Sequence, residues 1–292
     1  MFVTTLIASP KARNLDPALV ENLRNAWGGG DVVWLAPDEA ASFDLETPPM
    51  NAQDVWQSCQ DMGVDLVIQP RHGQRKKMLL ADMDSTMIQQ ECIDELADEA
   101  GVGARVKDIT ARAMNGELDF EGAIDARVGL LEGLPERIID DVLKTRITYM
   151  PGGATLLATM KANGAYAALV SGGFTAFTSA VATKLGFDEN RANTLDVKDG
   201  KLTGHVVRPI LGQEAKLEAL DQITDRLGID RSEVIAVGDG MNDLLMLANA
   251  GTGVALHGKP ALQAECDVRI NHGDLTALLY LQGYAKSEFV DV

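Results

Sequence analysis

The chain has 292 residues, of which 46% are hydrophobic, and a formal net charge of −17. This length allows two domains or one domain with a large insertion, and the hydrophobic fraction argues against global disorder. The strong negative charge argues against nucleic acid or an anionic membrane as a partner.

The sequence shows no sign of a membrane or secreted protein. No apolar run reaches the roughly 18 residues of a membrane span, and no basic segment precedes the first apolar stretch, so we expect no signal peptide. The three cysteines, Cys59, Cys92 and Cys266, lie far apart, which is typical of reduced thiols in the cytoplasm. Four scattered histidines argue against a zinc site.

Residues 1–75 predict a small α+β domain. Strands are expected at 2–8, 31–35 and 65–69, with an uncertain one at 39–45, and helices at 17–27 and 53–62. The polar, basic stretch 70–77 follows as a linker and marks the domain boundary. We expect a structural or assembly role for this domain, and a regulatory ligand site is the alternative.

An apolar strand over residues 78–81 ends in two acids, Asp82 and Asp84. A continuous apolar run is typical of a central parallel strand that helices cover on both faces. Because open α/β sheets bind ligands beyond the carboxyl ends of their strands, both carboxylates are expected in that crevice. A plain D-x-D turn is the alternative, since Asp is common in turns.

The pattern turns helical after this strand, from Glu91 to about residue 144, without a convincing strand signal. We expect a helical insertion over about residues 90–148, which forms a cap over the strand ends. Residues 114–117 predict a turn within the cap, and Asp119 is expected to cap a helix over 120–131.

The sheet resumes with a helix at 154–163 and a strand at 166–170, followed by Ser171-Gly172-Gly173 and a helix that ends at about residue 186. Glycines let the backbone approach an anion, the Ser hydroxyl is a donor, and a helix N-terminus favours phosphate. A tight βα turn explains the same residues. A β-hairpin is expected around residues 199–200, within 192–210.

Lys216 follows on a helix, where a lone lysine is ordinarily solvated. The strand at 234–237 then leads into Asp239, Asn242 and Asp243, and these oxygen ligands suit Mg²⁺. Strands at 253–256 and 268–270 complete the sheet. The predicted fold class is α/β, with a parallel-sheet core over residues 76–292, an inserted helical cap and the N-terminal α+β domain.

Four segments in this order and spacing, D-x-D-S-T, S-G-G, a lysine and G-D-x-x-N-D, resemble the haloacid dehalogenase superfamily of phosphohydrolases. The resemblance covers residues 78–272. The longer stretches DMDSTMIQQECIDELA, TARAMNGELDFEGAIDARVGLLEGL and LVSGGF are similar to the phosphoserine phosphatases. This resemblance implies a Rossmann-like core and the hydrolysis of O-phospho-L-serine to L-serine and phosphate, the last step of serine biosynthesis.

Matching positions imply a role for each candidate residue. The catalytic residues are Asp82 as nucleophile, Asp84 as general acid and base, and Lys216. The Mg²⁺ ligands are Asp82, the backbone carbonyl of Asp84, and Asp239, with Asp243 in support. The substrate-binding residues are Glu91, Met114, Phe120, Arg127, Ser171, Gly172 and Asn242.

Other interpretations stay open. Without the resemblance, Glu91 and Arg127 read as surface charges, whereas opposite charges in a cap suit a zwitterionic substrate. A phosphotransferase with an alcohol acceptor, or a phosphatase of broader range, would use the same core. Some relatives carry ligand-binding domains at their N-terminus, so residues 1–75 are alternatively an ACT-like amino-acid sensor. A homodimer is a further expectation.

Overall fold

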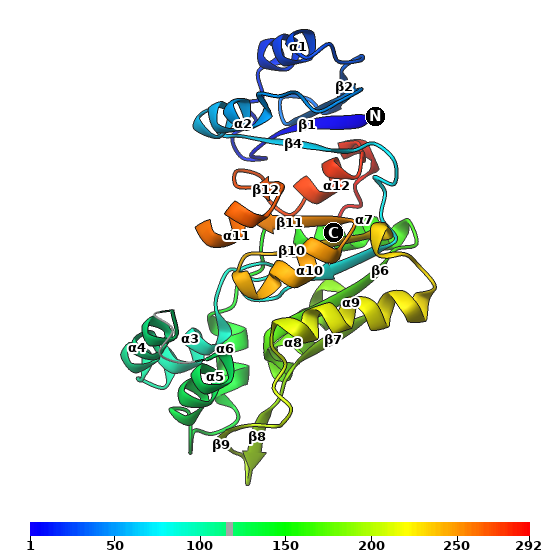
Figure 1. The fold of residues 1–292 in the computed structure, drawn as a ribbon. Coiled ribbons are helices and arrows are strands. Elements are labelled where there is room, and N and C mark those ends of the chain that lie inside the picture. The colour runs from blue at the N-terminus through cyan, green and yellow to red at the C-terminus, as the bar shows by residue number, and fades with distance from the viewer. Residues whose placement is uncertain (115–118) are drawn as a thin grey trace.

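A computed structural model describes residues 1–114 and 119–292, without the side chains of Ala111, Ala113, Met114 and Phe120. A four-stranded sheet lies at one end of the molecule, a six-stranded sheet in the middle, and the cap helices at the other end (Figure 1). None of the helices in the described part of the chain is long and apolar enough to cross a membrane.

The central sheet is parallel throughout, with the strand order β12-β11-β10-β5-β6-β7. Its strands are β5 (Met78–Ala81), β6 (Tyr166–Phe174), β7 (Glu189–Asn193), β10 (Val234–Gly238), β11 (Thr252–Leu256) and β12 (Val268–Ile270). The chain fills one side of β5 first and then the other, so the strand order reverses between β5 and β10. Ligand sites of open α/β sheets lie at such a reversal.

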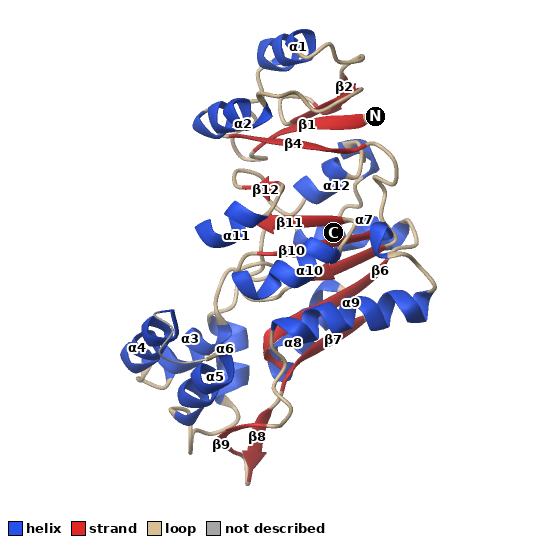
Figure 2. Ribbon diagram, viewed as in Figure 1, coloured by secondary structure: helices blue, strands red, loops and turns tan. Residues whose placement is uncertain are grey.

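Helices cover both faces of this sheet (Figure 2). These helices are α7 (Gly153–Ala162), α8 (Thr175–Leu185), α9 (Gln213–Leu227), α10 (Leu244–Asn249), α11 (Pro260–Glu265) and α12 (Ala277–Leu281). Leu79 and Ala81 of β5 belong to the core cluster that includes α7, α8 and α12. Met78 and Leu80 belong to the cluster that includes α9, α10 and α11. All four side chains are buried, which explains the uninterrupted apolar run in the sequence.

The cap consists of α3 (Cys92–Glu99), α4 (Gly103–Met114), α5 (Phe120–Gly129) and α6 (Ile138–Thr145). Asp119 caps α5 as predicted, because its Oδ1 accepts from Gly122 N at 2.7 Å. The turn predicted at 114–117 lies largely outside the residues that the structure describes.

The predicted hairpin is present as β8 (Leu195–Lys198) and β9 (Lys201–Val206). Asp199 and Gly200, with φ of 53° and 72°, form its tight turn. Leu202 N donates to Leu134 O at 2.9 Å, and Gly133 N donates to Leu202 O at 2.8 Å. The hairpin therefore bonds to the cap.

The N-terminal sheet is antiparallel, with the order β2-β3-β1-β4. Its elements are β1 (Phe2–Ala8), α1 (Pro17–Ala26), β2 (Val33–Ala36), β3 (Ala40–Leu45), α2 (Ala52–Asp61) and β4 (Val64–Pro70). One face packs with α1 and α2 in a cluster of its own. From the other face, Ile7, Ala40 and Val67 join the core cluster of the central sheet.

One uncertain strand is confirmed, and two others differ from their sequence-based description. The uncertain strand at 39–45 exists as β3. The edge strand β7 was not predicted, because its sequence, ENRAN, has no apolar run. Strand β6 continues through Ser171 to Phe174, and its register with β7 shifts after Val170. The helix α8 therefore begins only at Thr175, and the SGG segment belongs to a strand end instead of a helix N-terminus.

Candidate active site

A cavity of about 480 Å³ lies at the carboxyl ends of β5, β6 and β10, between these ends and the cap. The register pairs Ala81 with Val237, so Asp82 and Asp239 emerge at the same edge of the sheet. Residues from the core and the cap line it together: Asp82, Asp84, Glu91, Ile93, Thr110, Asp119, Ala123, Ile124, Arg127, Ser171, Gly172, Gly173, Phe174, Asp239, Met241, Asn242 and Lys259.

Lys216 lies behind this cavity and contacts two carboxylates. Its Nζ is 2.7 Å from Asp82 Oδ1 and donates to Asp243 Oδ1 at 2.5 Å. The lysine is 1% exposed, although a lone lysine on a helix is ordinarily solvated. Both carboxylates raise the pKa of Lys216 against the effect of burial, so the ammonium stays charged.

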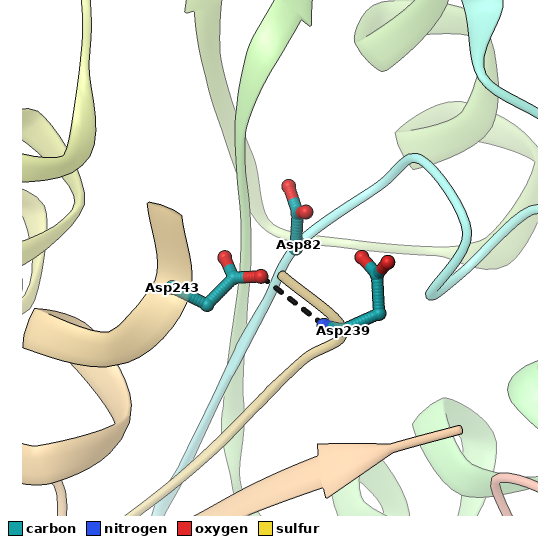
Figure 3. A group of neighbouring side chains, drawn as sticks. All are labelled: Asp82, Asp239 and Asp243. Carbon is teal, nitrogen blue, oxygen red and sulfur yellow. Dashed lines mark hydrogen bonds between the residues drawn. The ribbon is translucent and has the colours of Figure 1, made fainter. Parts of the chain in front are cut away.

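Asp243 supports the loop after β10 with its second oxygen. Asp243 Oδ2 accepts from Asp239 N at 3.1 Å (Figure 3). The same oxygen accepts from Gly240 N, also at 3.1 Å. A Cβ at Gly238 would lie 2.3 Å from Asp243 Cγ, so this position requires glycine. Both oxygens of Asp243 are thus engaged, and they hold Lys216 and the backbone of Asp239.

The acids at this edge fit a hard cation. One carboxylate oxygen each of Asp82, Asp239 and Asp243 lies within 4.8 Å of the others, and all three residues are buried. Asp243 already accepts three hydrogen bonds. Asp82 Oδ1 is buried and accepts no aligned hydrogen bond, even though Lys216 is near. Burial and the charge of Asp243 raise the pKa of Asp82, and a cation beside it would stabilise its charged form.

Asp84 lines the same cavity and has a different environment. Cys92 N donates to Asp84 Oδ1 at 3.1 Å, which ties this carboxylate to the first turn of α3. Burial, with the charge of Glu91, raises the pKa of Asp84 to about 7. A carboxyl group with such a pKa can both donate and accept a proton near neutral pH.

The end of β6 also lines the cavity, through Ser171 to Phe174. Gly173 N donates to Ser171 Oγ at 2.8 Å, and Asn193 Nδ2 donates to Gly172 O at 2.9 Å. A Cβ at Gly173 would lie 2.8 Å from Asp84 Oδ2, so glycine lets the strand end approach this acid. Asn193 was not singled out in the sequence, because its role depends on the neighbouring strand β7.

The cap contributes Glu91 and Arg127. Ser85 Oγ donates to Glu91 Oε1 at 2.9 Å, which joins the cap entrance to the loop after β5. Arg127 Nε donates to Ala123 O within α5 at 3.2 Å. Burial lowers the pKa of Arg127, while the acids Asp94, Glu91 and Asp84 oppose this change.

The structure brings together most of the residues that the sequence singled out. Asp82, Asp84, Glu91, Arg127, Ser171, Gly172, Asp239 and Asn242 line the cavity. Lys216 and Asp243 contact residues that line it. The side chains of Met114 and Phe120 lie outside the described part of the protein.

Sequence reasoning missed Lys259 in the cavity wall. Its Nζ lies 3.2 Å from Asp239 Oδ2 and 3.7 Å from Glu91 Oε1. It precedes a proline at the start of the short helix α11 and belongs to none of the four sequence motifs. The signal in the sequence was its place three residues after the end of strand β11, at the edge of the sheet where the other site residues lie.

Residues 79–248 match the family of haloacid dehalogenase-like hydrolases. A phosphoserine phosphatase of Streptomyces coelicolor is 38% identical over 252 residues, which are 86% of this chain and 61% of that protein. One of Haemophilus influenzae is 45% identical over 204 residues, 70% of this chain and 65% of that protein. The chain therefore spans less than two thirds of the length of either relative.

Two solved structures extend the comparison. A hydrolase of the same family from Salmonella enterica is 30% identical, has a TM-score of 0.86, and matches 96% of this chain and 98% of its own. A phosphoserine phosphatase described as a phospho-aspartyl intermediate analogue is 43% identical with a TM-score of 0.66. The match covers 70% of this chain and 98% of the chain in that structure.

Proposed function

The chain belongs to the haloacid dehalogenase-like hydrolases, and we propose that it hydrolyses O-phospho-L-serine to L-serine and phosphate in serine biosynthesis. One observation carries this proposal. A single cavity holds the acids Asp82 and Asp84 from the core and the opposite charges Glu91 and Arg127 from the cap. The core side suits phosphoryl transfer, and the cap side suits a zwitterionic amino acid.

The reaction begins with Asp82 as nucleophile. Its carboxylate attacks phosphorus, and the bond between phosphorus and the serine oxygen breaks, which leaves a phosphoryl group on Asp82. Asp84 transfers its proton to the departing oxygen and so releases serine with a hydroxyl group. The raised pKa of Asp84, about 7, supplies the protonated form that this step requires.

Asp84 then acts as a base. Its carboxylate takes a proton from a water molecule while the water oxygen attacks phosphorus. The bond between phosphorus and Asp82 breaks, so phosphate leaves and the Asp82 carboxylate is regenerated. Both half-reactions use the same two side chains, and Asp84 returns to its protonated state.

The remaining core residues stabilise the negative charge of the phosphoryl group. Lys216, which Asp82 and Asp243 keep charged, offsets the negative charge of the phosphoryl group. Ser171, Gly172 and Asn242 line the cavity where that group would lie. Asp82, Asp239 and the Asp84 carbonyl would hold Mg²⁺, which supplies Lewis-acid stabilisation of the phosphoryl oxygens when it is bound.

The cap residues select the substrate. The guanidinium of Arg127 can hold a carboxylate through two hydrogen bonds, and Glu91 can accept from an ammonium group. We place the enzyme in the cytoplasm, which is supported by its free cysteines, Cys59, Cys92 and Cys266.

Phosphate release from a panel of small phosphoesters, with Mg²⁺ and with EDTA, tests the proposal. We expect phosphoserine to be hydrolysed far faster than phosphothreonine, phosphoethanolamine or p-nitrophenyl phosphate, and EDTA to abolish turnover. Equal rates across the panel would remove the proposed selectivity of the cap. Undiminished turnover in EDTA would contradict the proposed dependence on Mg²⁺. A lack of phosphate release from every phosphoester in the panel would contradict the proposed phosphatase activity.

A further inference from the structure

A buried carboxylate joins the N-terminal sheet to the core, next to the end of strand β12. Asp65 lies on β4 and has no exposed surface. The residues that follow β12 surround it, and β4 lies against β12. A charge in such a place is costly unless its oxygens are fully hydrogen-bonded, so its partners are informative.

Three successive backbone N–H groups satisfy Asp65. Asn271 N donates to Oδ1 at 2.8 Å, and Gly273 N donates to Oδ2 at 2.8 Å. His272 N lies between them, 3.0 Å from Oδ2 and 3.2 Å from Oδ1. A row of N–H groups that converges on an anion holds the backbone in one conformation. The position of the 271–273 loop thus depends on an acid from the N-terminal domain.

The 271–273 loop in turn contacts the segment that carries Lys259. His257 Nε2 donates to Gly273 O at 2.8 Å, and His257 N donates to Ile270 O at 2.7 Å. His257 has a φ of 46°, a conformation that a non-glycine residue adopts only where its surroundings require it. Two residues later, Lys259 N donates to Asp239 O at 2.8 Å.

Lys259 ends this series inside the active-site cavity. Its Nζ approaches Asp239, a proposed Mg²⁺ ligand, and Glu91, a proposed substrate ligand. The described lining of the cavity includes five acids and two bases, Arg127 and Lys259. A misplaced Lys259 would therefore leave neighbouring carboxylates uncompensated where a phosphate ester must bind.

We propose that Asp65 of the N-terminal domain is a positioning residue for Lys259, and that Lys259 helps to bind the phosphoester by balancing Asp239 and Glu91. This inference rests on the proposed phosphatase function. It gives the N-terminal domain a role in catalysis that requires no effector. The path runs from Asp65 through the 271–273 loop and His257 to Lys259.

The test compares Asp65→Asn with a matched variant, Glu39→Gln. Glu39 is also a buried acid of the N-terminal domain, but it accepts from Tyr280 Oη at 2.7 Å and pairs with Lys286. Both variants keep the side-chain size and weaken the contact between domain and core. In Asp65→Asn the new amide nitrogen would face backbone donors, whereas Tyr280 still finds an acceptor in Glu39→Gln.

Each variant is assayed as the full chain with Mg²⁺ and phosphoserine, well below its melting temperature. We expect Asp65→Asn to lower kcat/KM about tenfold, because a substitution within a packed hydrogen-bonded network changes the coupling between distant sites by about this amount. Lys259→Met should lower kcat/KM about 10- to 100-fold, because the variant loses a charged hydrogen-bonding group. Glu39→Gln should stay within about twofold of wild type, and Lys259→Arg should restore part of the Lys259→Met loss.

The double variant decides whether Asp65 acts through Lys259. When Lys259→Met is already present, Asp65→Asn should lower kcat/KM by less than about twofold. The same tenfold loss in both backgrounds would overturn the proposal, as would an equal loss in Glu39→Gln or none in Asp65→Asn. If Asp65→Asn does not fold, His257→Ala interrupts the same path and should show the same dependence on Lys259.

Mg²⁺ titration calorimetry gives a readout that does not depend on turnover. The variant Lys259→Met removes the ammonium group beside Asp239, so Mg²⁺ should bind about two- to fivefold more tightly. A change of this size corresponds to the interaction between two partly exposed charges. Asp65→Asn should tighten Mg²⁺ binding in the same direction, with no further change in the double variant. An unchanged affinity in Asp65→Asn would overturn the path. An inactive wild-type enzyme would overturn the proposed function alone, since the titration still tests the path.

Discussion

The two walls of the active-site cavity differ in how firmly they are held. The core wall is lined by Asp82 and Asp239, and behind it Lys216 and Asp243 are at most 1% exposed and bond to each other and to the backbone of Asp239. In the cap wall, the Glu91 side chain is 41% exposed and contacts Ser85 and Lys259. In the proposed mechanism the chemistry therefore depends on buried, mutually constrained charges, while substrate selection depends on side chains that solvent reaches.

This difference has a physical reason. A phosphoryl group must meet fixed charges, because preorganised groups cost no reorganisation during the reaction. In the proposed function the cap admits a polar substrate and releases a polar product, and charges that stay near solvent suit this exchange. Variants in the two walls should accordingly fail in different ways.

The largest effect is expected at Asp82, the proposed nucleophile. Asp82→Asn should lower kcat for phosphoserine by about 10⁴-fold or more, because an amide cannot form the phosphorylated intermediate. The rate of phosphate release measures this loss. The control is Asp44→Asn, because Asp44 is an exposed residue that pairs with Arg71. Substantial Mg²⁺-dependent turnover in Asp82→Asn would show that the core wall does not act through covalent catalysis.

The next effect concerns stability. Lys216→Met leaves Asp82 and Asp243 buried without their shared cation, so the free energy of unfolding should fall by about 3–5 kcal/mol. Chemical denaturation measures it. The control Lys161→Met breaks a partly exposed pair with Asp188 and should cost less than about 1 kcal/mol. Similar losses in the two variants would remove the distinction between buried and exposed charges.

A smaller and selective effect is expected in the cap. Arg127→Ala should lower kcat/KM for phosphoserine about 100-fold, because a bidentate contact to the substrate carboxylate is lost. With p-nitrophenyl phosphate, which has no carboxylate, the loss should stay below about threefold. Steady-state kinetics on both substrates compare the losses, and an equal loss on both would place Arg127 in the chemistry instead.

The smallest effect is a change in pH dependence. Deprotonated Asp84 cannot protonate the leaving oxygen, so kcat/KM should fall as the pH rises through the pKa of Asp84, about 7. The charge of Glu91 helps to raise this pKa, so Glu91→Gln should move the falling limb to lower pH. Glu121→Gln, an exposed cap acid that pairs with Arg208, should leave the limb in place.

A limb that does not move in Glu91→Gln would mean that the two walls are not electrostatically coupled. A limb that moves equally in Glu121→Gln would mean that the net charge of the cap, rather than the position of Glu91, sets the pKa of Asp84.

Much of the core could be read from periodicity. The run at 78–81 and the strand at 234–237 are buried on both faces, and hydrophobic burial of that kind leaves a local signal. The hairpin at Asp199-Gly200 was readable because its turn demands particular residues. Strand β7 was not readable, since a polar edge strand pairs through its backbone alone.

The sequence by itself determined the α/β class, the helical insertion and the acids that follow the strands. The tertiary structure decided which distant residues meet them: Lys216 between two buried carboxylates, and Lys259 between the core and cap walls. It also decided that Asp65, which reads as one acid in a strand, accepts from three backbone N–H groups more than 200 residues away. Burial periodicity is local and leaves a pattern in the chain, whereas a charge pair depends on distance in space, which only the folded chain sets.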